Sequence, residues 1–255
     1  MPDGGARETV AVAATAPVSR RDLQARVDSL TWYHTLELGS DVVTPGMFDH
    51  RPFVARYRLP ERLDGLRVLD IGTWDGFWAF EMEKRGAREV VAIDLASEGE
   101  MDRPPGRGPA EDKPQGRHEG FELAREALGS RVDRRVVSVY DATPAELGRF
   151  DLIFCGSVLI HLRDPMLALE RIADLCEGTF VSAEGYSPLA GLFPIPAALF
   201  RADRPRSVVY WEPSARTWGR MLLISGFGEV KREGKFRLRA RDGWSVRHVV
   251  HHAHK

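Results

Sequence analysis

The chain has few cysteines, no excess of either charge and no long apolar run. Its 255 residues include 36 lysines and arginines against 37 acidic residues, so no net field favours binding to nucleic acid. Cys155 and Cys176 form no metal-binding pattern, and we expect free thiols and no metal site. No stretch resembles a signal peptide or a membrane span, which favours a soluble, cytoplasmic protein without membrane contact.

The length favours one α/β domain preceded by a shorter N-terminal part. Residues 1–19 are small and polar without periodicity, and we expect them to be disordered. An amphipathic pattern from Ser19 to Leu38 predicts a helix, and we interpret residues 20–60 as a helical lid on a domain formed by residues 61–255. Residues 97–120 contain four prolines and five glycines, which predicts a flexible insertion, either an active-site flap or a solvated loop.

Apolar strands and amphipathic helices alternate along the rest of the chain, which predicts a parallel sheet covered by helices. Late strands are expected over residues 236–240 and 246–250, around the Asp242–Gly243 turn. His251, His252 and His254 lie in the last five residues, and we expect them in solvent.

The most informative stretch is residues 67–76, Arg-Val-Leu-Asp-Ile-Gly-Thr-Trp-Asp-Gly. A strand that ends at Asp70, a turn with two glycines, a helix and a second strand that ends at Asp94 form the layout of a nucleotide-binding unit. Glycines let the backbone approach the ligand, and the second carboxylate can accept from ribose hydroxyls. The first carboxylate would repel a pyrophosphate, but it suits a cationic group such as the ammonium of S-adenosylmethionine (SAM).

With these segments in order, residues 60–255 resemble the class I SAM-dependent methyltransferases. Within that family, the chain resembles the branch that contains bacterial tRNA wobble-uridine (5-oxyacetyl) transferases and many small-molecule and sugar methyltransferases. The segments that carry this closer resemblance are Trp32-Tyr33-His34, Thr44-Pro45-Gly46, residues 69–78 and residues 156–165. The resemblance implies a Rossmann-like, seven-stranded sheet flanked by helices, with SAM as the cofactor.

The resemblance also implies which residues bind the cofactor. For the methionine half of SAM these are Asp70, Gly72, Thr73 and Gly76; for the ribose, Asp94; for the adenine, Tyr140 and Asp141; and for the sulfonium, Gly156, Ser157 and Ile160. We also expect Trp74 and Leu95 to contact the cofactor. Trp74 stands where these turns usually have a middle glycine. Its indole either covers the cofactor, walls the substrate pocket or packs on the helix.

One position separates this chain from the RNA-modifying branch. Those members carry tyrosine directly before the histidine that corresponds to His161, where it helps to hold the extra carboxylate of carboxy-SAM. Ile160 stands there instead. A hydrogen bond to a charged group contributes about 1.5–3 kcal/mol, so its absence favours plain SAM. Together with the balanced charge, this makes a nucleic-acid partner unlikely and favours a small-molecule acceptor.

Methyl transfer to a hydroxyl needs a base, and two histidines are candidates for it. His161 follows the fourth strand and His34 lies on the expected lid; the alternative is a structural role for each. We expect substrate contacts from Trp32, Tyr33, Glu184 and Phe193. Arg237, Arg239 and Arg241 form a basic strand face, which is either solvated or contacts RNA phosphates. The apolar residues 189–200 form either a substrate lid or the surface of a homodimer.

We therefore expect a SAM-dependent methyltransferase that acts on a hydroxyl of a sugar or natural product. The alternatives are a tRNA wobble-uridine transferase, which would bind tRNA with a steep dependence on salt, and a non-catalytic SAM-binding protein, which would show no turnover.

Overall fold

The structure, a computed structural model, describes residues 19–103, 117–204 and 207–255. Its centre is a seven-stranded sheet in the order β3-β2-β1-β4-β5-β9-β8, in which only β9 runs antiparallel to its neighbours. The strands are β1 (Arg67–Ile71), β2 (Glu89–Asp94), β3 (Asp133–Val136), β4 (Phe150–Gly156), β5 (Cys176–Gly185), β8 (Glu229–Arg239) and β9 (Ser245–His254).

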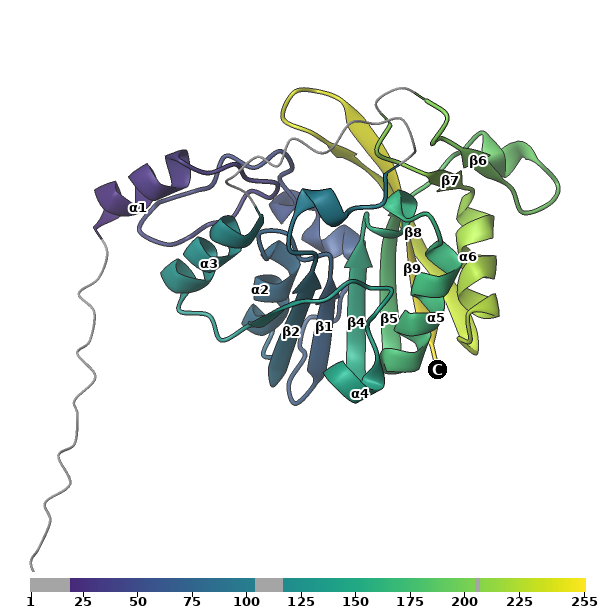
Figure 1. Ribbon diagram of the computed structural model, residues 1–255, viewed down its shortest axis with the longest axis horizontal. Coiled ribbons are helices and arrows are strands. Elements are labelled where there is room, and N and C mark those ends of the chain that lie inside the picture. The colour runs from purple at the N-terminus through teal and green to yellow at the C-terminus, as the bar shows by residue number, and fades with distance from the viewer. Residues whose placement is uncertain (1–18, 104–116, 205–206) are drawn as a thin grey trace, which may run out of the picture.

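Helices cover both faces of this sheet (Figure 1). One face packs against α1 (Arg20–Asp28), α2 (Phe77–Lys84) and α3 (Arg117–Leu128), and the other against α5 (Pro165–Leu175) and α6 (Ala215–Ile224). Side chains alternate between the two clusters along each strand, so that Val68 joins the first and Leu69 the second. The shorter helices are α4 (Pro144–Leu147), η1 (Arg51–Tyr57), η2 (Glu98–Glu100), η3 (Leu159–His161) and η4 (Ala190–Leu192). The predicted α/β architecture is confirmed.

The N-terminal segment is helical over a shorter range than the sequence predicts. Ser19 caps α1 by accepting from the backbone N–H of Asp22, but the helix ends at Asp28 rather than near Leu38. Beyond Asp28, a backbone N–H group that would donate to a carbonyl in a continued helix donates to a side chain instead: the N–H of Leu36 donates to the hydroxyl of Thr44. The segment from residue 31 to residue 50 therefore runs as an irregular chain over the end of the sheet.

The C-terminal hairpin is longer than predicted. β8 begins at Glu229, and β9 continues to His254 between β5 and β8. The expectation that the last histidines lie in solvent is wrong for His251, which is 3% exposed, because β9 is an interior strand of the sheet. The alternation predicted for the basic strand holds, with Arg237 and Arg239 exposed and Leu238 and Ala240 buried.

Two predicted regions lie largely outside the described residues. These are the disordered N-terminus, residues 1–19, and most of the 97–120 insertion, of which the structure describes only the ends around η2 and the start of α3. A small separate sheet, β6 (Ala198–Phe200) with β7 (Trp211–Pro213), stands between β5 and α6. No helix in the described ranges combines the length and the apolar composition that a bilayer span requires. Both cysteines are free thiols, as predicted, and the structure buries both.

Candidate active site

A cavity of about 1170 Å³ lies at the carboxyl ends of the parallel strands. Its floor comes from the ends of β1, β2, β4 and β5, and its roof comes from the N-terminal segment and the β8–β9 hairpin. The roof is held together because Phe48 bridges Ala240, and the N–H of Arg241 donates to the carbonyl of Met47. Ligand pockets usually measure about 300–1,000 Å³, so this cavity is larger than a single small ligand requires.

The structure brings most of the predicted site residues to this cavity. Those that line it are Tyr33, His34, Asp70, Gly72, Trp74, Asp94, Leu95, Tyr140, Gly156, Ser157, Ile160 and His161. Six others do not line it: Trp32, Thr73, Gly76, Asp141, Glu184 and Phe193.

The turn after β1 shapes the floor. Gly72 has a φ of +73°, and a Cβ there would lie 2.4 Å from a methyl carbon of Val158. Trp74 also adopts a left-handed conformation, with a φ of +51°. Gly76, by contrast, packs under the ring of Phe80 at the start of α2, so it supports the turn from below rather than lining the cavity.

Asp70 is a buried carboxylate at the cavity floor. Its Oδ2 atom is buried and has no hydrogen-bond partner among the described residues. Burial raises the pKa of Asp70 to about 7. A cationic ligand group would supply the missing donor and stabilise the ionised form, so this position fits the ammonium of SAM.

Asp94 is the second carboxylate of the floor and closes the turn. It accepts hydrogen bonds from the backbone N–H groups of Trp74, at 2.7 Å, and Leu95, at 2.8 Å. A carboxylate offers about four lone-pair sites, so Asp94 can also accept from the hydroxyls of a ribose.

Tyr140 forms the wall at the other end of the floor. Its hydroxyl donates to Asp102 at 2.6 Å and accepts from the N–H of Asp164 at 3.1 Å. Burial raises the pKa of Tyr140, which keeps the hydroxyl protonated. Asp141 is exposed beside it and does not reach the cavity. We predicted that both Tyr140 and Asp141 contact the adenine. Only Tyr140 of these two residues lies where it could do so.

The N-terminal segment is fixed to the floor by Asp75, a residue that sequence analysis treated only as part of the turn. Its fully buried carboxylate accepts from the backbone N–H groups of Tyr33, at 2.8 Å, and His34, at 2.9 Å, and it also pairs with His34 Nδ1. This arrangement fixes the imidazole of His34 at the cavity wall. The sequence carried one sign of this role, because Asp75 is a carboxylate in the middle of a tight turn.

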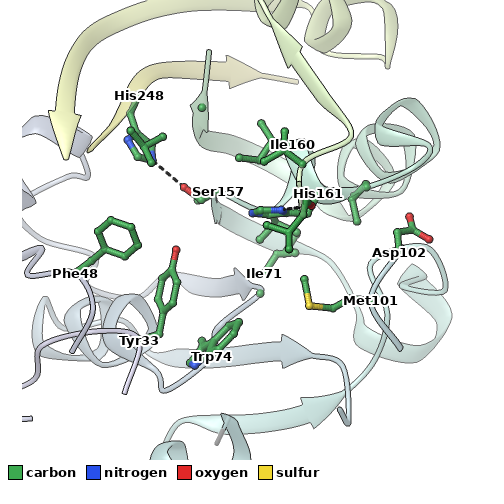
Figure 2. A pocket seen from close by; sticks show the side chains of 18 of the residues that line it. Tyr33, Phe48, Ile71, Trp74, Met101, Asp102, Ser157, Ile160, His161 and His248 are labelled. Atoms are coloured by element: carbon green, nitrogen blue, oxygen red, sulfur yellow. Dashed lines mark hydrogen bonds between the residues drawn. The ribbon is translucent and has the colours of Figure 1, made fainter. Parts of the chain in front are cut away.

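Aromatic rings wall the half of the cavity below the roof (Figure 2). The rings of Tyr33 and Trp74 lie 4.8 Å apart and tilted by 32°. Phe48 contacts Tyr33 and is met edge-on by Trp244. Such flat faces suit a ring-shaped acceptor.

His161 lies across the cavity from these aromatic rings (Figure 2). Its Nδ1 is 2.8 Å from the carbonyl of Val208. A carbonyl only accepts, so Nδ1 carries the proton and Nε2 is the acceptor nitrogen of the neutral ring.

Trp32, Glu184 and Phe193, from which we expected substrate contacts, do not line the cavity. Trp32 is buried in the core and donates from Nε1 to the carbonyl of Val27. Glu184 lies beneath the turn after β4, where its Oε1 accepts from the N–H groups of Val158 and Leu159. Burial raises the pKa of Glu184 to about 8. Phe193 is 53% exposed on the segment beyond the cavity. Of the four predicted substrate residues, only Tyr33 lines the cavity.

Comparisons with known proteins agree with this arrangement. Residues 49–230 match the family described as "Methyltransferase domain". The chain therefore belongs to the class I SAM-dependent methyltransferases, as its sequence indicated. A solved structure, the N-terminal domain of EvdMO1 in the presence of SAH and D-fucose, has the same fold, with a TM-score of 0.65 at 20% identity over 94% of this chain and 99% of that one.

Two curated relatives of the chain have different activities in their names. The ubiquinone biosynthesis O-methyltransferase of Hahella chejuensis is 30% identical over 154 residues, which cover 59% of this chain and 57% of that protein. The tRNA U34 carboxymethyltransferase of Desulforapulum autotrophicum is 27% identical over 173 residues, or 64% of this chain and 45% of that protein. The chain thus spans about half the length of the curated relatives it matches.

Proposed function

We propose that this protein transfers a methyl group from SAM to a small-molecule acceptor, a hydroxyl on the ring of a sugar or natural product. The observation that carries the proposal is the division of one cavity into two chemically different halves. The floor presents the carboxylates of Asp70 and Asp94, and the half below the roof is walled by aromatic rings such as those of Tyr33 and Trp74.

The floor residues fit the parts of the cofactor one by one. Asp70 would hold the ammonium, Asp94 the ribose hydroxyls and Tyr140 the adenine, while Gly72 lets the turn lie close against Val158. Bound SAM supplies a methyl group on a positively charged sulfur, which a nucleophilic oxygen can attack. The protein then has to orient the acceptor, exclude water and accept one proton.

The roof fits a small acceptor better than a tRNA. Ile160 lines the cavity where the RNA-modifying branch has tyrosine, and its apolar side chain offers no hydrogen bond to an extra carboxylate. Of the basic strand, Arg241 donates to the carbonyl of Pro45 and thus joins the roof. The tRNA alternative remains worth testing because of the U34 carboxymethyltransferase relative.

The apolar segment 189–200 supports two further proposals. Leu189 and Leu199 line the cavity, which favours a substrate lid, whereas Leu192 and Ile195 are 79% and 67% exposed and suit the surface of a homodimer. Light scattering coupled to size exclusion separates the two proposals, and a Leu192→Ser/Ile195→Ser variant would lose only the dimer.

Calorimetric titration with SAM, S-adenosylhomocysteine (SAH) and carboxy-SAM tests the cofactor. We expect micromolar binding of the first two and loss of it in Asp94→Ala. Tighter binding of carboxy-SAM would favour the tRNA activity, and no binding of any would refute the proposal. Radiolabelled methyl transfer to catechols and glycosides then tests the acceptor, and SAM binding without turnover on any acceptor would favour a non-catalytic protein.

A further inference from the structure

Three histidines reach the cavity, and one of them was not anticipated as part of it. His34 and His161 have their Nδ1 atoms engaged by Asp75 and by the carbonyl of Val208. His248, at the cavity end of β9, instead directs Nε2 toward the hydroxyl of Ser157, 2.8 Å away (Figure 2). Both members of this pair line the cavity.

Ser157 lines the cavity, and we expect it beside the sulfonium of SAM, where acceptor and cofactor would meet. It follows the last residue of β4, and its N–H donates to the carbonyl of Ala183. Its φ of +58° is unusual for a residue other than glycine. Such conformations persist where the surroundings determine them and cluster at functional sites.

His248 is held rigidly. It pairs with Gly185 of β5 on one side and with Phe236 of β8 on the other. Its ring stacks on that of Phe236 at 5.1 Å and 10°, and the residue is 2% exposed. The ring thus cannot turn its Nε2 away from Ser157 without disturbing the packing between strands.

We propose that Ser157 and His248 form the proton relay of the reaction: the Ser157 hydroxyl binds the hydroxyl of the acceptor, and His248 takes the proton. This inference rests on the proposed function. As the acceptor oxygen forms its bond to the methyl carbon, the electrons of the carbon–sulfur bond go to sulfur. The acceptor proton passes to Ser157 Oγ, whose own proton passes to His248 Nε2. The imidazolium afterwards releases that proton to water.

The relay needs a neutral ring, not a strong base. Burial lowers the pKa of His248 to about 4, so the imidazole is neutral at physiological pH. An oxygen that has gained a methyl group while still carrying its proton is a strong acid. Transfer of that proton to even a weak base is therefore favourable.

Other titratable groups surround the pair and must be separated from it in any pH experiment. His34 and His50 line a water-sized pocket behind Ser157, together with Tyr57, whose hydroxyl lies 2.7 Å from His50 Nδ1. Glu184 lies under the turn that follows Ser157. Lys235 of β8 pairs with the residue after His248.

Nitrogen-detected NMR of the histidine side chains tests the pair without any acceptor. In the wild-type protein and its SAH complex, we expect the His248 imidazole to stay neutral from pH 8 to pH 5.5. We also expect its Nε2 resonance to shift in Ser157→Ala. If His248 titrates near pH 6.5 like an exposed histidine, or its resonance is unchanged in Ser157→Ala, the relay is refuted.

Kinetics with the acceptor found in the transfer screen test the role. General bases contribute about 10²–10⁴-fold, so we expect Ser157→Ala and His248→Gln each to lower kcat at least a hundredfold. The affinity of His248→Gln for SAH should stay within threefold of the wild-type value. The double variant should lose no more than the worse single variant, because the two residues act as one unit. With saturating SAM, kcat of the wild-type protein should decline as the pH falls toward 4, where His248 becomes protonated. This decline should be missing in His248→Gln.

His251→Gln is the matched control, because His251 is a buried histidine of the same strand that does not line the cavity. We expect this variant to keep its activity. A larger loss in His34→Gln or His161→Gln, with the pair variants still active, would assign the base elsewhere and overturn the inference. A wild-type protein that binds no SAH would instead refute the proposed function.

Discussion

We expect Asp70 to make cofactor binding depend on pH, with an affinity that rises as the pH rises. Burial raises the pKa of Asp70 to about 7, and its Oδ2 atom is buried without a hydrogen-bond partner among the described residues. If only the ionised carboxylate holds the ammonium of the ligand, the affinity for SAH is proportional to the ionised fraction of Asp70. SAH binding at neutral pH then displaces a proton, and affinity increases with pH.

The size of the effect follows from the ionised fraction. With a pKa of about 7, half of Asp70 would be ionised at pH 7, about one eleventh at pH 6 and about one hundredth at pH 5. We expect the affinity for SAH to fall about fivefold from pH 7 to pH 6, or about 1 kcal/mol, and about fiftyfold from pH 7 to pH 5. At pH 7, binding should release about half a proton per ligand.

Calorimetry in buffers of different ionisation enthalpy measures both quantities. Asp70→Asn should bind SAH more weakly and with no pH dependence over this range. Glu184→Gln is the control, because Glu184 also has a raised pKa but does not line the cavity, and it should keep the wild-type dependence. An affinity that is flat from pH 5 to pH 7, or proton uptake on binding, would refute the role of Asp70.

Three further predictions concern the support of the site. The free energy of unfolding of the wild-type protein should fall by a few kcal/mol, relative to that of Glu184→Gln, as the pH rises from 5 to 8. The reason is that the pKa of Glu184 in the folded protein, about 8, lies above its usual value, so that ionisation costs more in the folded than in the unfolded protein. Urea titrations at several pH values measure this difference. Asp75→Ala should lower the free energy of unfolding by about 2–4 kcal/mol, because it leaves the N–H groups of Tyr33 and His34 without their acceptor. Limited proteolysis of this variant should cut the N-terminal segment first. Gly72→Ala should weaken SAH binding and lower the melting temperature, and adding Val158→Ala should restore part of the stability because it removes the clashing methyl carbon; no recovery would contradict that explanation.

The sequence predicted what depends on local pattern. The apolar run that ends at Asp70, the glycine turn and the strand that ends at Asp94 each follow from neighbouring residues, and the structure has all three. The choice between Trp32 and Tyr33 could not be predicted. In a segment without regular periodicity nothing local decides which of two adjacent aromatic residues faces the core and which faces the cavity.

His248 was missed for a different reason. β9 runs antiparallel to the other strands, so its first residues, not its last, lie at the carboxyl edge where ligands bind. That placement depends on the order of the strands in the sheet. A histidine near the C-terminus gives no local sign of it.

Trp74 explains how the floor and the roof are joined. A left-handed conformation costs a residue other than glycine about 1–3 kcal/mol. Against this cost, the Trp74 N–H donates to the Asp94 carboxylate, a bond of about 1.5–3 kcal/mol, and the indole packs on Tyr33, which adds about 0.5–1.5 kcal/mol. The next residue, Asp75, holds the backbone of Tyr33 and His34. Two successive residues of the turn thus hold the carboxylate of Asp94 and the N-terminal segment. A glycine at position 74 would keep the hydrogen bond from its N–H to Asp94 but lose the packing of the indole on Tyr33. We therefore interpret the tryptophan as the residue that shapes the aromatic half of the cavity.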